Sequence, residues 1–162
     1  MKITALFFGV FAGCLSCIPA HAADYLWNGG NGSWTDSGAW RLDDSSADWS
    51  NGNTAQFQTD SSITVGSGIS ASGMLYNGAA ITLNGGSLTL TGAAAGNNGG
   101  SATLSNTGLI LDAPNAEDSY EVRDTSLTGS ATLAKTGAGT VTLDGAHTAS
   151  GVWNINAGTL VF

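Results

Sequence analysis

The chain ends with two short, similar segments, each of which begins with a glycine. Gly139–Leu143 reads Gly-Thr-Val-Thr-Leu, and Gly158–Phe162, which starts 19 residues later, reads Gly-Thr-Leu-Val-Phe. Apolar residues at every second position, next to β-branched ones, are typical of a β-strand. A repeat of strand-like segments at so short a distance indicates a solenoid, in which each turn of the chain stacks on the turn before it.

Related segments lie further upstream. The pentapeptide Gly-Ser-Ala-Thr-Leu occurs at Gly100–Leu104 and again at Gly129–Leu133, and a similar segment begins at Gly86. Asn-Gly and Thr-Gly pairs between the segments mark turns, because a positive φ is easily adopted there. Short strands joined by tight turns fit either an antiparallel sandwich or a parallel coil, and the self-similarity favours the coil.

We therefore predict an all-β chain that forms a right-handed parallel β-helix, a solenoid of about six coils, with essentially no helix after Ala23. In this fold like residues of successive coils stack in register, so the inward ones form a continuous apolar column. The residues predicted to point inward are Leu88, Leu90, Val141, Leu143, Leu160 and Phe162. Those predicted to line the outer face are Ser87, Thr89 and Thr142.

Two stretches interrupt the strand pattern. Residues 23–58 form a Trp- and Gly-rich segment that we interpret as an N-terminal cap, and residues 59–162 hold the predicted coils. Residues 112–124 contain Pro114 and five acids, and we expect this stretch to be a loop that leaves the coil.

The first 22 residues have the features of an export signal. Lys2 precedes an apolar run, and Ala20-His21-Ala22 is a small-residue cleavage pattern, with cleavage predicted between Ala22 and Ala23. An alternative is a lipoprotein, because Phe11-Ala12-Gly13-Cys14 resembles a lipobox in which Cys14 would carry the lipid. Both readings predict an exported protein, on the outer-membrane surface or outside the cell.

Cleavage at this site would leave a strongly acidic chain without cysteine. Both cysteines precede Ala22, and Arg41, Arg123 and Lys135 remain against twelve acids, a net charge of −9. Such a surface repels phosphate groups, so we expect no binding of nucleic acid. The chain must be stabilised by packing and hydrogen bonds alone, since no disulfide can form.

Four tryptophans in the predicted cap are the first candidates for a binding function: Trp27, Trp34, Trp40 and Trp49. Exposed aromatic rings on a rigid β surface can stack on sugars, which would make them a glycan contact. The alternative is that the rings cover the end of the apolar column, and we favour this alternative.

The acidic residues are candidates for metal binding or glycoside hydrolysis. Asp36, Asp43, Asp44 and Asp48 offer oxygen ligands, but their spacing matches no calcium-binding loop. Glycosidases need two rigidly held carboxyl groups, and the acids of residues 112–124 lie in the predicted loop. The one histidine after Ala22, His147, is expected to face solvent in a turn. We therefore predict no catalytic residues, no metal site and no cofactor.

The segment 133–161 closely resembles the autotransporter-associated β-strand repeat of bacterial passenger domains. Its matching positions are Leu133, Lys135, Gly137, Gly139, Thr140, Val141, Leu143, Gly145, Gly158, Thr159 and Leu160. The sequence departs from the family pattern at His147–Gly151 and Val152–Asn154. The segment Trp27–Trp34 also resembles the opening that often precedes such repeats.

The resemblance implies a secreted or surface-displayed passenger segment, a structural and adhesive β-helix stalk whose partners are glycans or proteins of host or neighbouring cells. It also implies an outer-membrane translocator barrel, which is absent from the printed sequence. We therefore expect the chain to be a fragment truncated at its C-terminus, and the alternative is that another exporter carries it. The alternative function is an extracellular β protein that binds or degrades polysaccharide, including an all-β sandwich binding module.

Overall fold

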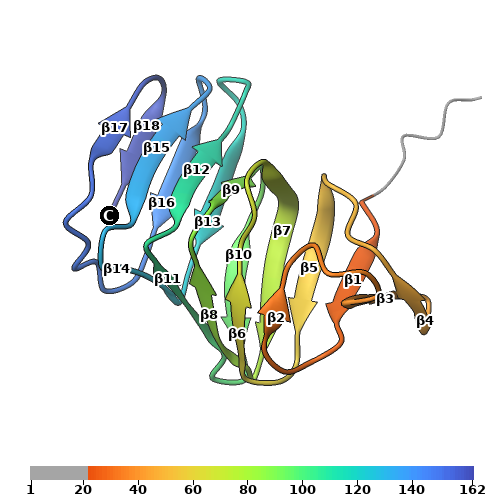
Figure 1. Cartoon of the computed structure of the whole chain (residues 1–162). Coiled ribbons are helices and arrows are strands. Elements are labelled where there is room, and N and C mark those ends of the chain that lie inside the picture. The colour runs from red at the N-terminus through yellow and green to blue at the C-terminus, as the bar shows by residue number, and fades with distance from the viewer. Residues whose placement is uncertain (1–21) are drawn as a thin grey trace, which may run out of the picture.

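The computed structural model describes residues 22–162, and these residues form stacked parallel coils with three flat faces (Figure 1). The predicted signal peptide, apart from Ala22, and the alternative lipidation site Cys14 lie outside this part. No helix occurs in it, and the parallel β-helix prediction is confirmed. The chain completes about five turns, against the roughly six that we predicted.

Each coil contributes one strand to each face in turn. The first face contains β1 (Asp24–Trp27), β5 (Asn53–Phe57), the second half of β7 (Ile69–Asn77), β10 (Ala94–Asn97), β13 (Ser119–Val122), β16 (Thr140–Leu143) and β18 (Thr159–Val161). The second face contains β2 (Gly32–Ser33), β6 (Ser61–Thr64), β8 (Ala80–Asn84), β11 (Ser101–Ser105) and β14 (Thr125–Thr128). The third face contains the first half of β7, β9 (Ser87–Leu90), β12 (Gly108–Asp112), β15 (Thr132–Thr136) and β17 (Trp153–Ile155).

All strand pairs between coils are parallel, and β7 is long enough to turn a corner between two faces. Its residues 69–71 pair with β9, and its residues 74–77 pair with β10. The only antiparallel pairs in the described part join β1 to β3 (Trp40–Leu42) and β3 to β4 (Ser45–Ala47). β3 and β4 form a hairpin in the segment that connects β2 to β5, at the N-terminal end of the stack (Figure 1).

Inward residues of successive coils stack in register, because the side chains of a strand alternate between its two sides. On the second face the column consists of Ile63, Leu83, Leu104 and Leu127. On the third face it consists of Ile69, Leu88, Leu109, Leu133 and Trp153. On the first face it consists of Ala55, Met74, Ala94, Val122 and Leu143. These columns, closed on three sides by sheet, make one continuous apolar core.

The predicted inward residues are confirmed where another coil covers them. Leu88, Leu90, Val141 and Leu143 are buried. Leu160 is only partly buried, and Phe162 is 67% exposed, because both belong to the last turn of the stack.

The prediction that residues 112–124 leave the coil as a loop is wrong for Asp112, which ends β12, and for residues 119–122. Residues 119–122 form β13, which lies between β10 and β16 on the first face. Residues 113–118 make an irregular connection, which carries Pro114, and residues 123–124 form the short corner before β14. The sequence-based prediction missed the alternation of polar and apolar residues in β13 because acids precede and follow it.

No helix in the described part is long and apolar enough to cross a membrane.

Candidate functional site

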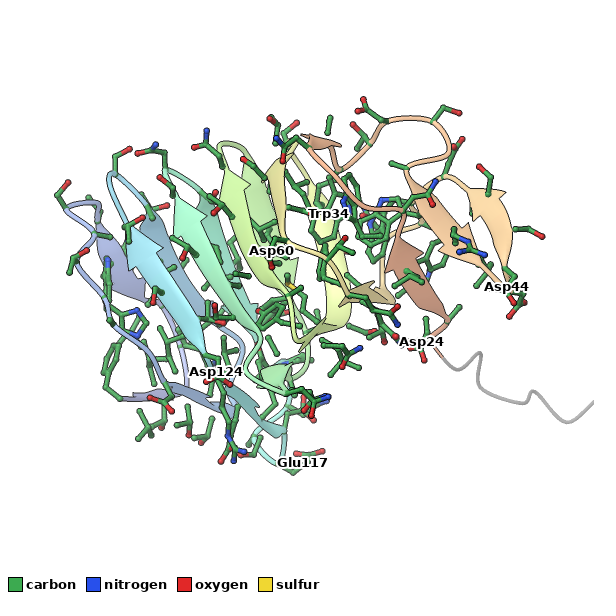
Figure 2. All side chains as sticks on the ribbon, turned by 90° about the horizontal axis from the view of Figure 1, so that it is seen from below. Asp24, Trp34, Asp44, Asp60, Glu117 and Asp124 are labelled. Carbon is green, nitrogen blue, oxygen red and sulfur yellow. The ribbon has the colours of Figure 1, made fainter. Side chains whose placement is uncertain are left out.

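The four tryptophans of the N-terminal segment pack together across the end of the core. Trp34 and Trp40 have no exposed surface, Trp27 is 5% exposed, and Trp49 is partly buried. The ring centroids of Trp34 and Trp40 are 4.9 Å apart, and those of Trp40 and Trp49 are 4.7 Å apart. Both buried rings also contact Phe57 of the first face. Figure 2 shows Trp34 inside the stack rather than on its surface.

Hydrogen bonds hold the rings of Trp27, Trp40 and Trp49 in place, whereas the buried Nε1 of Trp34 has no partner among the described residues. Trp40 Nε1 donates to the carbonyl oxygen of Trp34 at 2.8 Å, and Trp49 Nε1 donates to Asn51 Oδ1 at 2.9 Å. Three of the four rings therefore present no free face to a sugar. The predicted glycan contact remains a prediction, and in this structure it is restricted to Trp49.

The acids of the hairpin region serve local turns. Asp36 Oδ2 accepts a hydrogen bond from the backbone N–H of Ser33 at 2.8 Å, and Asp48 Oδ1 accepts one from that of Gly38 at 2.8 Å. Asp44, at the hairpin tip, pairs with Arg41 at 3.1 Å (Figure 2). Among residues 22–162 no three potential metal ligands lie together.

Three of the five acids of residues 112–124 accept hydrogen bonds, each from a different part of the chain. Asp112 Oδ1 accepts from Thr136 Oγ1 at 2.8 Å, and Asp118 Oδ2 accepts from the backbone N–H of Asn115 at 2.8 Å. Asp124 Oδ2 accepts from the backbone N–H of Gly96 at 3.1 Å. Figure 2 places Glu117 at the tip of its connection, apart from Asp124. No pocket opens in the described part of the chain.

The segment 133–162 forms one complete coil and the start of the next, and its glycines lie where the chain turns against the previous coil. A Cβ on Gly139 would lie 2.5 Å from the carbonyl oxygen of Asp118 and 2.6 Å from that of Asn115. Gly158 has φ +68°, and a Cβ there would collide with the carbonyl oxygen of Gly139. These positions need glycine because the backbones of adjacent coils approach closely at the corner.

Lys135 is the unexpected residue of this segment, because its side chain lies inside the solenoid. In β15 it stands in the inward column between Leu111 and Ile155, and it has no exposed surface. Its Nζ donates to the carbonyl oxygens of Thr136 at 2.5 Å, Gly137 at 2.9 Å and Ala157 at 3.5 Å. The ammonium group thus joins a corner of one coil to the next coil.

Burial lowers the pKa of Lys135, because a charged amine is less stable away from water, and the carboxylate of Asp112 opposes this effect. Sequence reasoning identified Lys135 as a family position but not as an inward one. The signal was available, since Lys135 follows the inward Leu133 by two residues and a strand returns to the same side at that distance.

His147 does not face solvent freely, so that prediction is wrong. It forms a parallel bridge with Leu127, which extends the inward column of the second face. Its ring packs against Trp153 and Phe162, with centroid distances of 5.6 Å and 6.2 Å. Burial lowers the pKa of His147, and the nearby Asp144 opposes this effect. Neither ring nitrogen has a hydrogen-bond partner.

The outward side of the second face carries two rows of uncharged polar side chains. One row consists of Ser62, Thr82, Thr103 and Ser126, and the other of Thr64, Asn84, Ser105 and Thr128. Adjacent strands of a sheet lie about 4.8 Å apart, so each row repeats its hydroxyl or amide group at that interval. This face offers a regular array of hydrogen-bond donors and acceptors.

Comparison with known proteins agrees with this geometry over the last coil. No curated protein and no solved structure matches the chain significantly. Residues 133–162 match the model of the passenger-associated-transport-repeat family. The predicted resemblance to an autotransporter passenger repeat is thereby confirmed over this segment, and the repeat implies an exported, surface or extracellular protein. The segment that matches the passenger-associated-transport-repeat thus forms one complete coil and the start of the next in a parallel β-solenoid.

Proposed function

We propose that this chain is a rigid stalk segment of an autotransporter-type passenger, displayed at the outer-membrane surface, with a structural and adhesive role and no catalysis. The observation that carries the proposal is that the passenger-associated repeat at residues 133–162 continues the same parallel coils as the rest of the chain. A stack with one core and hydrogen bonds between successive coils resists bending, which suits a spacer that holds other parts away from a membrane.

The adhesive part of the proposal rests on the second face. Its two polar rows contain no charged residue, whereas the chain as a whole is acidic. Hydroxyl and amide groups can exchange hydrogen bonds with the hydroxyl groups of a neutral glycan, and a flat array can make many such bonds at once. The partners proposed are therefore neutral glycans on host or neighbouring cells.

The absence of catalysis is supported by the surroundings of the acids. Hydrolysis of a glycosidic bond uses two carboxyl groups that face each other across a substrate site, about 5 to 10 Å apart. Here Asp112, Asp118 and Asp124 accept hydrogen bonds from separate turns. Their geometry suits turn stabilisation.

Export as a passenger can be tested by display. The full chain is joined to an outer-membrane translocator barrel in a Gram-negative host, and surface exposure is measured by antibody labelling of intact cells and by added protease. We expect the chain to reach the surface in a folded, protease-resistant form. Retention of the unmodified chain in the periplasm would contradict the passenger role.

A matched pair of glycine variants tests whether the corner geometry of the repeat matters for display. Gly139→Ala places a Cβ against the carbonyl oxygens of Asp118 and Asn115, whereas at Gly66 the nearest atom to an added Cβ is 3.8 Å away. We expect Gly139→Ala to lower the amount of resistant protein at the surface several-fold and Gly66→Ala to leave it unchanged.

Adhesion is tested separately, with the purified chain on immobilised neutral polysaccharide. The double variant Thr82→Val and Thr103→Val removes two hydroxyl groups from one row and keeps the shape of both side chains. Thr89→Val, on the outer side of the third face, is the control. We expect weaker binding for the double variant only. Equal binding by all three proteins would remove the second face from the proposal.

A further inference from the structure

Six Asn-Gly pairs mark turns of this solenoid, and they share a chemical reactivity that a stalk does not use. Their asparagines are Asn28, Asn31, Asn51, Asn77, Asn84 and Asn98. Asparagine is one of the thermolabile residues of proteins. When glycine follows it, the main-chain nitrogen of the glycine can reach the side-chain amide carbon, because no Cβ stands in the way. The six pairs lie in different surroundings, so their reactivity can be compared within one chain.

The reaction is a deamidation through a cyclic imide. The nitrogen of the glycine N–H forms a bond with asparagine Cγ, the Cγ–Nδ2 bond breaks, and the proton passes through solvent to Nδ2, which leaves as ammonia. Water then opens the ring. Addition of water at Cγ gives aspartate, and addition at the main-chain carbonyl carbon gives isoaspartate, in which the chain runs through the former side chain. The reaction requires that the side-chain amide and the glycine N–H are both free to move.

Asn98 and Gly99 have this freedom. They are the central residues of a turn that is closed by a hydrogen bond from the N–H of Gly100 to the carbonyl oxygen of Asn97 at 3.1 Å. Both have a positive φ, +53° and +82°, as in a type I′ turn, and both are exposed. A Cβ added to Gly99 would meet no atom within 4 Å. Neither the Asn98 side chain nor the N–H of Gly99 makes a hydrogen bond with another described residue.

The pair Asn51–Gly52 is the opposite case. Asn51 Oδ1 accepts hydrogen bonds from Trp49 Nε1 at 2.9 Å and from the N–H of Ser70 at 3.0 Å, and its Nδ2 donates to the carbonyl oxygen of Gly68 at 2.9 Å. The N–H of Gly52 donates to the carbonyl oxygen of Ser70 at 3.0 Å. All of these bonds must break before the ring can close.

The remaining pairs are held by fewer bonds. In Asn77–Gly78 and Asn84–Gly85 the glycine N–H donates to a carbonyl oxygen of the next coil, at 2.8 Å and 3.3 Å respectively. Asn31 Oδ1 accepts a hydrogen bond from a main-chain N–H of β6 at 3.0 Å. Asn28 is exposed, and its Nδ2 makes one long hydrogen bond, to the carbonyl oxygen of Gly38 at 3.5 Å. Asn28 is therefore expected to be the second most reactive asparagine of the six.

We propose that Asn98 is the site of spontaneous deamidation in the folded chain, and that hydrogen bonds slow the same reaction at the other Asn-Gly pairs. The modification turns a neutral amide into a carboxylate, which is charged at neutral pH. It adds a negative charge at the corner between the first and second faces, where Asp124 Oδ2 accepts a hydrogen bond from the N–H of Gly96 at 3.1 Å. Isoaspartate also lengthens the main chain of the turn by one carbon atom.

Peptide mapping by mass spectrometry tests the proposal. The purified full chain is incubated at mildly alkaline pH and body temperature, and the conversion of amide to acid is followed at each of the six asparagines. We expect Asn98 to react at least about tenfold faster than Asn51, because reaction at Asn51 requires local opening of the coil. A rate at Asn98 no higher than that at Asn51, or earlier modification of any other asparagine, overturns the proposal.

The unfolded chain is the matched control. In concentrated urea the six asparagines have the same following residue and no fixed partners, so we expect their rates to lie within about threefold of one another. If Asn98 leads the others by the same factor in urea, local sequence is the cause and the role of the hydrogen bonds is overturned.

Two variants identify the reacting residue. Asn98→Gln keeps an amide in the turn, but closure would need a larger ring, so we expect the early modification to disappear. Asn77→Gln makes the same change at the corresponding corner of the previous coil and should leave the early modification in place. Circular dichroism verifies that both variants fold. Early modification that persists in Asn98→Gln overturns the assignment.

The effect on the turn has its own measurement. An extra main-chain atom between Asn97 and Gly100 should break the hydrogen bond that closes the turn. We expect amide hydrogen exchange at Gly100 to be several-fold faster in the aged chain than in the fresh chain, and unchanged in Asn98→Gln aged in the same way. Equal exchange in the aged and the fresh chain would overturn this effect.

Discussion

The first and the last described turns of this solenoid differ in how well the apolar core is covered. At the N-terminal end the core is covered by Trp34, Trp40 and the hairpin that follows them, and both rings are fully buried. In the last described turn a comparable aromatic group, Trp153 and Phe162 with His147, is only partly covered. The comparison teaches that repeated coils lengthen the stack, whereas the N-terminal end of the core is covered by residues of a different pattern.

Closure requires residues that do not follow the repeat. Between β2 on the second face and β5 on the first, residues 34–52 take the place of the third-face strand that the later coils have there. This segment reverses direction at β3, whose Trp40 pairs with Trp27 in an antiparallel register. An antiparallel pair ends the parallel series, and large rings fill the area that a further coil would occupy.

The largest effect is expected from removing a ring of the closed end. Trp40→Ala should destabilise the fold by about 3–5 kcal/mol, because it opens a cavity in a fully packed cluster. Trp153→Ala, in the open aromatic group, should destabilise it by about 1 kcal/mol, since that ring is already partly in water. Urea unfolding followed by circular dichroism measures both. Equal losses of unfolding free energy in the two variants would mean that both aromatic groups stabilise the fold to the same extent.

An intermediate effect is expected from the buried amine that joins the last two coils. Lys135→Ala removes the donor for the carbonyl oxygens of Thr136, Gly137 and Ala157 and should destabilise the chain by about 1–3 kcal/mol. Amide hydrogen exchange shows where the loss falls. We expect faster exchange in β17 and unchanged exchange in β5, because coils of a solenoid contact only their neighbours. Uniformly faster exchange would show that the stack unfolds as one unit.

A smaller loss of unfolding free energy is expected from a substitution in the last described turn. Ile155→Ser changes a side chain that is 58% exposed, so the unfolding free energy should change by less than about 1 kcal/mol. Phe57→Ser, beneath the tryptophan cluster, is the matched change at the closed end and should be destabilising by several times as much. Urea unfolding at one protein concentration compares the two.

The smallest effect on stability is expected when acid protonates His147. Its pKa in the folded chain is lowered by burial, so its contribution to stability is fully present above its ordinary pKa of about 6.5 and is lost as the pH falls through the folded value. The thermal midpoint of the unchanged chain should therefore fall slightly more between pH 7.5 and pH 5.5 than that of His147→Phe. A parallel decline in the two proteins would mean that His147 titrates as it does in water.

Sequence reasoning succeeded where one coil repeats another. The glycine-led segments at Gly139 and Gly158 predicted the parallel stack, and Leu88 and Leu143 were correctly placed inside. It failed where burial depends on the next coil or on a broken pattern. Lys135 was taken as a family position only, His147 as a solvent-facing turn residue and the stretch that forms β13 as a loop.

The candidate surface could be predicted in part. Alternation of Thr and Ser with apolar residues predicted polar outer rows, but their assignment to one face needed the register that pairs Thr82 with Thr103. The same holds for the tryptophans. The sequence favoured a cap over a sugar platform without excluding the latter, and the packing of Trp34 against Trp40 placed these two rings inside the fold.

The sequence by itself determined the strands, the direction in which they stack and the resemblance of the last coil to a known repeat. These follow from local alternation and from glycines at fixed intervals. Tertiary structure alone decided which apolar residues are covered, how Lys135 comes to lie among carbonyl groups and how the tryptophans cover the N-terminal end of the core. The physical reason is that burial is a property of pairs of coils, and the neighbour of a given residue lies about twenty positions away along the chain.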